Sequence, residues 1–134
     1  MNTVSPTKGA VLLVDDDKFL VEMYASKFVR EGFTVQACIS VGDALEHLRH
    51  GFAADAIIFD LVMPERDGFS FLEALSSEKL ATNAVKIALT NQGEEVEKTR
   101  TMSLGADMYI VKASKIPSEV VNIASEEIAR RKHT

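Results

Sequence analysis

The stretch AIIFDLVMPERDG, residues 56–68, decides the fold class of this chain. Its first four residues are apolar or small, and such a run is typical of a β-strand that is buried on both faces of a sheet. The run ends on Asp60, which therefore lies where the strand leaves the sheet. Pro64 and Gly68 then indicate a turn before the next helix. A buried carboxylate costs free energy unless its charge is compensated, so the sequence must hold compensating groups elsewhere.

Strands and helices alternate along the rest of the sequence. Apolar runs predict strands at residues 10–14, 33–38, 56–60, 84–90 and 108–112. Apolar stripes at helical spacing predict helices that include residues 19–28, 44–48, 69–75, 94–104 and 117–128. This alternation predicts an α/β fold, a doubly wound five-stranded parallel sheet in the order 2-1-3-4-5 with five helices on its two faces. The second strand mixes polar and apolar residues, which suits an edge of the sheet.

Length and charge restrict the possible functions. At 134 residues we expect one domain at 10–130 without a separate output domain, a polar tail at 1–9 and a short basic tail at 131–134. The net charge of −5 does not favour nucleic acid as the main partner. No apolar run is long enough for a signal peptide core or a membrane span, so we expect a cytoplasmic protein. Cys38 is the only cysteine, which excludes an internal disulfide.

Polar residues end four of the five predicted strands. In an open parallel sheet, ligands bind outside the carboxyl ends of the strands, where the strand order reverses. We therefore expect one shared site made of Asp15, Asp16, Asp60, Thr90 and Lys112. Carboxylates about 4 Å apart repel by roughly 4 kcal/mol per pair at an effective dielectric constant of about 20. Lys112 alone does not balance three carboxylates, and a hard divalent cation such as Mg²⁺ completes the balance.

Such a site is suited to phosphoryl transfer. Asp60 can act as a carboxylate nucleophile and form an aspartyl phosphate. Mg²⁺ and the ammonium group of Lys112 would offset charge on the phosphoryl oxygens, and Thr90 could donate its hydroxyl to them. The candidate catalytic residues are therefore Asp60, Lys112 and Thr90, and the candidate metal ligands include Asp15 and Asp16.

With these residues in place, the chain resembles the receiver domain of the two-component response regulators, over about residues 10–128, and looks most like the single-domain, chemotaxis-regulator-like members. The resemblance rests on the acidic pair after the first strand, the DLVMP run at residues 60–64 with its following glycine, the threonine that ends strand four and the lysine that ends strand five. It implies a flavodoxin-like fold and a signalling domain, not an enzyme. It also implies that Asp60 accepts phosphate from a histidine kinase or a histidine phosphotransfer protein.

The resemblance further implies a metal site and a switch. In that family the acidic pair and the phosphorylated aspartate hold Mg²⁺ with one backbone carbonyl, which here is that of Val62. The threonine and an aromatic residue of strand five move when phosphate binds; here these are Thr90 and Tyr109. The readout surface is then the helix at 94–104, strand five and the last helix, where a downstream protein or a second, phosphorylated copy would bind.

Three residues depart from the family pattern. Ala113 replaces the proline that usually follows the lysine, and because a cis bond before a non-proline residue costs about 2.5–4 kcal/mol, we expect a trans bond there. Asn91 replaces a small residue after Thr90 and narrows access to the phosphate. Val62 cannot position an attacking water as a polar side chain could, so we expect slow hydrolysis of the phosphoryl group.

Other functions and simpler roles remain open for some residues. Asp17 and Asp67 are better placed as helix N-caps than as metal ligands. A receiver-like scaffold that binds a partner without phosphorylation is compatible with Ala113 and Asn91. An aspartyl-nucleophile phosphatase of the haloacid dehalogenase type needs a second acid where Val62 stands. A flavin-binding flavodoxin is disfavoured because the acidic residues at 15–17 would repel a phosphate.

Overall fold

Parallel strands form one sheet at the centre of the molecule. The computed structural model describes residues 7–91 and 93–132, and all of the following concerns these residues. The strands are β1 (Ala10–Val14), β2 (Thr34–Cys38), β3 (Ala56–Asp60), β4 (Val85–Thr90) and β5 (Met108–Val111). Their order in the sheet is β2-β1-β3-β4-β5, and the pairs are parallel. The predicted strand order, with β2 at an edge, is confirmed.

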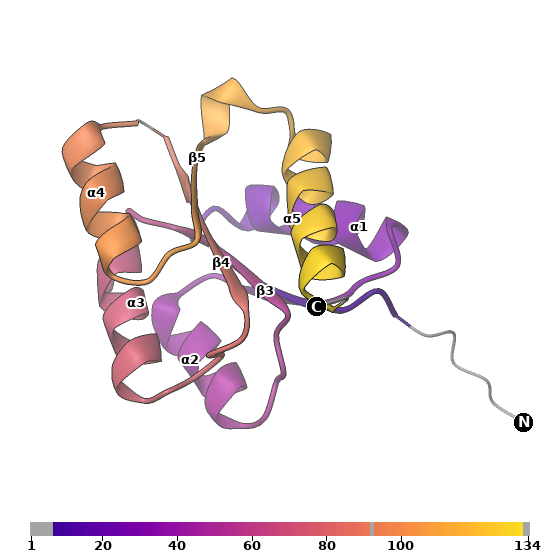
Figure 1. Ribbon diagram of the computed structural model, residues 1–134, viewed down its shortest axis with the longest axis horizontal. Helices are drawn as coiled ribbons and strands as arrows, with labels where there is room; N and C mark the ends of the chain where they lie inside the picture. Colours follow the sequence, from indigo (N-terminus) through magenta and orange to yellow (C-terminus); the bar gives the residue numbers. More distant parts are fainter. Residues whose placement is uncertain (1–6, 92, 133–134) are drawn as a thin grey trace, which may run out of the picture.

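Helices cover both faces of this sheet. They are α1 (Lys18–Arg30), α2 (Val41–Arg49), α3 (Gly68–Ser77), α4 (Glu95–Ser103) and α5 (Pro117–Lys132), with a short 3-10 helix, η1 (Lys112–Ser114), after β5. Figure 1 shows α1 and α5 on one side of the sheet and α2, α3 and α4 on the other. Because side chains alternate along each strand, they fill two cores, one containing Leu12 and Phe59 and the other Val11 and Ile58.

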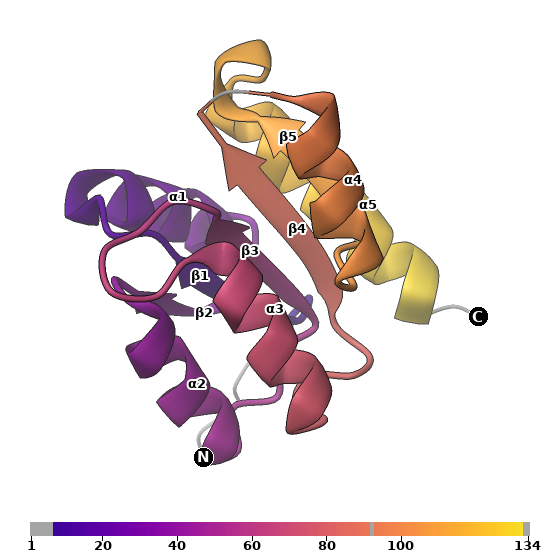
Figure 2. The ribbon, with the colours of Figure 1, turned by 90° about the vertical axis from the view of Figure 1, so that its left-hand side faces the viewer.

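β3 is the strand that positions the site. All five of its residues are buried, as the apolar run predicted for a strand with neighbours and helices on both sides. In the register of the sheet, Val14 of β1 pairs with Phe59 of β3, and Asp60 pairs with Leu89 of β4. Figure 2 shows the side-by-side arrangement of β1, β3 and β4. The residue after Val14, which is Asp15, therefore lies beside Asp60.

Side-chain caps begin three of the helices, and the sequence predicted two of them, Asp17 and Asp67. Asp17 accepts a hydrogen bond from the backbone N–H of Leu20 at 3.1 Å and begins α1. Ser40 begins α2, where its hydroxyl oxygen accepts from the N–H of Asp43 at 3.1 Å. Asp67 begins α3 in the same way. Each cap contributes about 1 kcal/mol and fixes where the chain turns after the carboxyl end of a strand.

Several boundaries differ from the sequence prediction: β2 and β4 begin one residue later than expected, α4 is one residue shorter at each end, and two further differences involve charged residues. β5 ends one residue earlier than expected, and Lys112 begins η1. α5 continues to Lys132, into the stretch that we expected to be a tail. The longer helix is held by Arg131, whose guanidinium forms ion pairs with Glu127 on the same helix and with Asp107 before β5.

The rest of the expected tails lies outside the described residues. These are residues 1–6 of the expected N-terminal tail and residues 133–134 at the other end. Just before β1, the N–H of Lys8 donates to the carbonyl oxygen of Gly32 at 2.9 Å, which ties this segment to the end of α1. Within the described part of the chain, no helix has the length and apolar character needed to cross a membrane.

Candidate functional site

Three carboxylates meet at the carboxyl edge of the sheet, as the sequence predicted. They belong to Asp15 and Asp16, which follow β1, and to Asp60, the last residue of β3, and their ligand oxygens lie within 4.8 Å of one another. Asp15 and Asp60 are buried, whereas Asp16 is exposed. The donor set consists only of oxygen atoms and opens to solvent on one side, which is the arrangement that Mg²⁺ prefers.

Lys112 supplies the cation that the sequence predicted. Its ammonium group donates a hydrogen bond to Oδ2 of Asp15 at 2.9 Å and lies 3.6 Å from Oδ2 of Asp60. Burial alone would lower the pKa of Lys112, but the hydrogen bond to Asp15 and the charges of both aspartates outweigh it, so the pKa is raised. Lys112 is therefore held in its charged form between the two buried carboxylates.

Asp60 occupies an unfavourable position for a negative charge. Burial raises the pKa of the Asp60 carboxyl, the charge of Lys112 lowers it, and the charge of Asp15 raises it, with a net increase. The N–H of Val62 lies 3.4 Å from Oδ1 of Asp60, a long contact that gives little stabilisation. The site therefore favours a ligand that brings positive charge close to Asp60. It also favours a reaction in which a carboxylate oxygen of Asp60 forms a covalent bond.

The raised pKa predicts how Asp60 affects stability as the pH changes. A carboxyl group whose pKa is higher in the folded state contributes stability that is fully present below its ordinary value of 3.8 and is lost as the pH rises through the raised value. In metal-free buffer, we expect the free energy of unfolding of Asp60→Asn to increase relative to that of wild type as the pH rises through the raised pKa of Asp60. Urea denaturation of both proteins at a series of pH values measures the difference. A difference that shrinks as the pH rises would contradict the assignment.

A backbone hydrogen bond closes the loop after Asp60. The N–H of Gly68 donates to the carbonyl oxygen of Leu61 at 2.9 Å. A Cβ atom on Gly68 would lie 2.7 Å from the backbone oxygen of Asp60 and 2.9 Å from Cα of Leu61. A glycine is therefore needed because the start of α3 packs directly on the backbone that carries Asp60. Val62, on this loop, has an exposed side chain.

This contact makes Gly68→Ala a test of the loop. The added methyl group must push the backbone at Asp60 away, and we expect a loss of about 1–3 kcal/mol in the free energy of unfolding, measured with urea. Gly42→Ala is the matched control, because a Cβ there meets nothing within 4 Å and Gly42 lies in α2. Equal stability of the two variants would show that the close approach at Gly68 has no energetic consequence.

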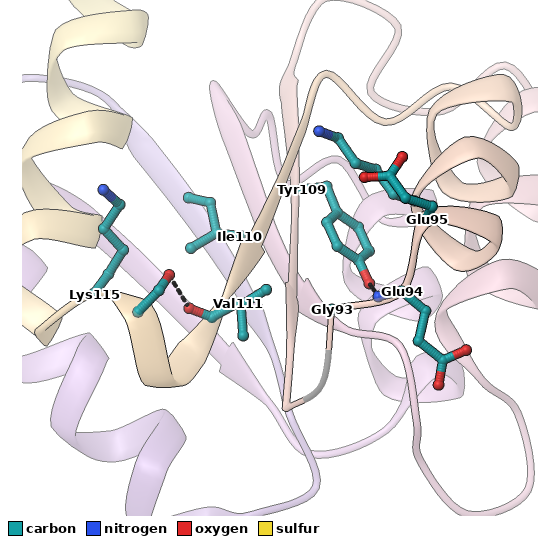
Figure 3. Close-up of a pocket in the computed structure, with 9 residues that line it drawn as sticks. Gly93, Glu94, Glu95, Tyr109, Ile110, Val111 and Lys115 are labelled. Atoms are coloured by element: carbon teal, nitrogen blue, oxygen red, sulfur yellow. Dashed lines mark hydrogen bonds between the residues drawn. The ribbon is translucent and has the colours of Figure 1, made fainter.

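Thr90 and Tyr109 are joined through a residue that the sequence interpretation did not identify. The hydroxyl of Thr90, which is buried at the end of β4, donates to Oε1 of Glu97 at 3.2 Å. The hydroxyl of Tyr109 donates to the same oxygen at 2.5 Å. It also accepts a hydrogen bond from the N–H of Glu94 at 3.3 Å, which Figure 3 shows as a dashed line beside the start of α4. Burial and the hydrogen bond to Glu97 raise the pKa of the Tyr109 hydroxyl.

α4 presents polar groups to the sheet, which explains why Glu97 was missed. Thr101, one turn after Glu97, is fully buried and donates its hydroxyl to the carbonyl oxygen of Glu97 at 2.7 Å. Val96, one of the few apolar residues of this helix, is 81% exposed. The spacing of Glu97 and Thr101 could have indicated a polar inner face, because residues four apart lie on the same side of a helix.

The residues that depart from the family pattern lie around this edge. The chain from Lys112 through Ala113 forms η1, and the described residues contain no cis peptide bond, so the expected trans bond is confirmed. Asn91 is exposed directly after Thr90.

Comparisons with known proteins agree with this arrangement. The family model described as response regulator receiver domain matches residues 11–123. Regulatory protein VanRc of Enterococcus gallinarum is 29% identical over 120 residues, which cover 90% of this chain and 50% of that protein. Transcriptional regulatory protein CpxR of Escherichia coli (strain K12) is 32% identical over 123 residues, 92% of this chain and 50% of that protein. The chain thus spans about half the length of these relatives.

Solved structures show the same fold. A response regulator receiver domain protein (CheY-like) from Methanospirillum hungatei JF-1 superimposes with a TM-score of 0.83 at 22% identity, covering 93% of this chain and 97% of that chain. The flavodoxin-like fold predicted from the resemblance is confirmed by this likeness and by the strand order. The matched family segment contains every strand of the described sheet except the first residue of β1. The chain belongs to the family of response regulator receiver domains of two-component systems.

Proposed function

We propose that this receiver domain is a phosphoacceptor in a two-component phosphorelay, and that Asp60 takes the phosphoryl group from a histidine kinase or a histidine phosphotransfer protein. The observation that carries the proposal is the surroundings of Asp60, which is buried, grouped with Asp15 and Asp16, and 3.6 Å from the ammonium group of Lys112. An oxygen of Asp60 forms a bond to phosphorus while the bond from phosphorus to the donor imidazole breaks, and the imidazole takes up a proton.

The residues around Asp60 have separate tasks in this step. Asp15, Asp16, Asp60 and the backbone carbonyl of Val62 are the candidate Mg²⁺ ligands, and their oxygen donors fit this ion. When bound, Mg²⁺ supplies positive charge against the phosphoryl oxygens. Lys112 already lies between two of the carboxylates and adds a second positive charge on the same side.

Glu97 connects phosphorylation to the proposed switch. Thr90 can donate its hydroxyl hydrogen to only one acceptor at a time, and that acceptor is now Glu97. When Asp60 carries a phosphoryl group, the Thr90 hydroxyl turns to a phosphoryl oxygen and leaves Glu97. Tyr109 shares the same carboxylate oxygen, so its position and that of α4 change with it. The surface made by α4, β5 and α5 then presents a different shape to a downstream protein.

Intact mass measurement tests the phosphoacceptor proposal. The protein is incubated with Mg²⁺ and acetyl phosphate and then weighed. We expect a gain of one phosphoryl group in wild type and in Asp67→Asn, and no gain in Asp60→Asn. Asp67→Asn is the matched control, because asparagine also caps a helix and Asp67 lies at the other end of the same loop. No gain in wild type would favour a scaffold that works without phosphorylation.

Val62 gives a prediction about the lifetime of the phosphoryl group. Its side chain is 70% exposed beside Asp60 and cannot orient a water for attack on phosphorus. We expect Val62→Asn to lose its phosphoryl group several-fold faster than wild type, because the amide can hold that water. Loss of label after removal of the phosphodonor measures the rate. Val62→Ala is the control that removes the side chain without adding a polar group; equal rates in all three proteins would contradict the role of this position.

The same proposal extends to the bounds of the domain, its partners and its place in the cell. We take residues 10–130 as the receiver domain, since the family match at 11–123 lies within them. The partners are a histidine kinase or phosphotransfer protein and a downstream protein, with no direct role for nucleic acid or a membrane in this domain. We place the domain in the cytoplasm, with α4, β5 and α5 available for a phosphorylation-dependent homodimer.

A further inference from the structure

A second cluster of metal-ligating side chains lies at the edge of the sheet, outside the acidic site. It consists of Cys38, the last residue of β2, and of Asp43 and His47 on the first two turns of α2. Their ligand atoms, a sulfur, a carboxylate oxygen and a ring nitrogen, all lie within 4.8 Å of one another. This donor set differs in kind from the three carboxylates around Asp60, because it contains a thiol and an imidazole.

The geometry points to a binding site for Zn²⁺ or a similar first-row transition ion held by Cys38, Asp43 and His47. Zn²⁺ is borderline-soft, binds sulfur, nitrogen and oxygen, and takes tetrahedral ligands about 3.5 Å apart. Three protein ligands leave the fourth position to water or to an outside ligand. Mg²⁺ prefers oxygen alone, so the two clusters are expected to select different ions.

The positions of the three side chains allow an ion to reach the cluster, and they allow the exposed ligands to move onto the ion. Asp43 and His47 are four residues apart on one face of α2, with Nε2 of His47 3.6 Å from Oδ1 of Asp43. Their side chains are 48% and 37% exposed, so they can rotate by the small distance that coordination needs. Cys38 is fully buried beneath them and fixed by the sheet. The ion would therefore bind at the surface, with its sulfur ligand below and its two other ligands closing from above.

The charges also suit a divalent ion. When the ion binds, the Cys38 thiol releases its proton to the solvent and becomes a thiolate ligand. The thiolate and the carboxylate together then neutralise the two positive charges of the ion. The site also adjoins the acidic cluster, because the N–H of Asp15 donates to the carbonyl oxygen of Cys38 at 3.0 Å.

Co²⁺ is the probe that tests this site, because thiolate coordination to Co²⁺ gives an intense near-ultraviolet absorption band. The full chain is titrated with Co²⁺ in excess Mg²⁺, which occupies the acidic cluster. We expect the thiolate band in wild type, displacement of Co²⁺ by Zn²⁺, and loss of the band in Cys38→Ser. Since Cys38 is the only cysteine, the band can have no other source in the chain.

Surface variants keep the test decisive if Cys38→Ser fails to fold. We expect His47→Gln and Asp43→Asn to weaken Co²⁺ binding at least about tenfold. His50→Gln, a histidine at the end of the same helix, is the control and is expected to bind as wild type does. Absence of the band at millimolar Co²⁺ would overturn the proposal. So would a band whose midpoint is unchanged in both His47→Gln and Asp43→Asn, because the cysteine would then act without these partners.

Discussion

Lys112→Met is expected to destabilise the metal-free protein by about 3 kcal/mol, because removal of one partner leaves buried charges uncompensated. Lys112 lies 2.9 Å from Asp15 and 3.6 Å from Asp60, and methionine keeps the length of its side chain without the charge. The ammonium group of Lys112 contributes to the free energy of unfolding. This contribution is fully present below the ordinary lysine pKa of 10.5 and is lost as the pH rises through the raised pKa of Lys112. Urea denaturation near neutral pH therefore measures its full effect.

Addition of Mg²⁺ distinguishes a stability loss caused by uncompensated charge from one caused by a packing defect. The ion adds positive charge beside the same carboxylates, so it should stabilise Lys112→Met more than wild type and narrow the difference between them. Lys115→Met, at an exposed position just after η1, is the control and is expected to unfold like wild type. If Lys112→Met were as stable as this control in metal-free buffer, the charge balance assigned to the site would be wrong.

Glu97→Ala is expected to shift the equilibrium toward the phosphorylated conformation, so that the affinity for a phosphoryl analogue rises roughly tenfold. The change removes the carboxylate that holds both Thr90 and Tyr109, and hydrogen bonds to a charged group contribute about 1.5–3 kcal/mol. The Thr90 hydroxyl then loses no hydrogen bond to Glu97 when it turns to a phosphoryl oxygen. Beryllium fluoride, a phosphoryl analogue, measures the effect as an equilibrium affinity in the presence of Mg²⁺.

The control for this experiment lies on the same helix. Glu95, also in α4, is exposed, and Glu95→Ala removes the same charge without touching the Thr90 and Tyr109 hydroxyls. We expect this variant to bind beryllium fluoride as wild type does. Weaker binding by Glu97→Ala than by wild type would mean that Glu97 supports the phosphorylated state, contrary to the proposed competition for Thr90.

The meeting of the charged groups could be predicted from the sequence because strand geometry determines it. Asp15 and Asp60 each follow an apolar run, and Lys112 follows a third, so a parallel sheet delivers them to one edge. The strand order followed from the polar second strand and the handedness of crossovers. Helix caps such as Asp67 were predictable for a similar reason, since the bond that a cap forms is local in sequence.

The contacts of α4 could not be predicted in the same way. Glu97 meets Thr90 and Tyr109 through side chains from three separate elements, and only the packed structure defines such a meeting. The few apolar residues of α4 gave no reliable direction either, since Val96 faces solvent and the buried residue is Thr101. The ion pairs of Lys112 with Asp15 and Asp60 likewise join residues far apart in the sequence, which a local pattern does not contain.

The most direct test of the central claim is to locate the phosphoryl group on the chain. Borohydride reduces an aspartyl phosphate to homoserine, which marks the modified residue for peptide mass spectrometry. After incubation with acetyl phosphate and Mg²⁺, we predict homoserine at position 60 and unmodified aspartate at positions 15 and 16. Homoserine at position 15 or 16 would contradict the proposed role of Asp60. So would a protein that has gained the mass of a phosphoryl group but shows no homoserine at any of the three positions.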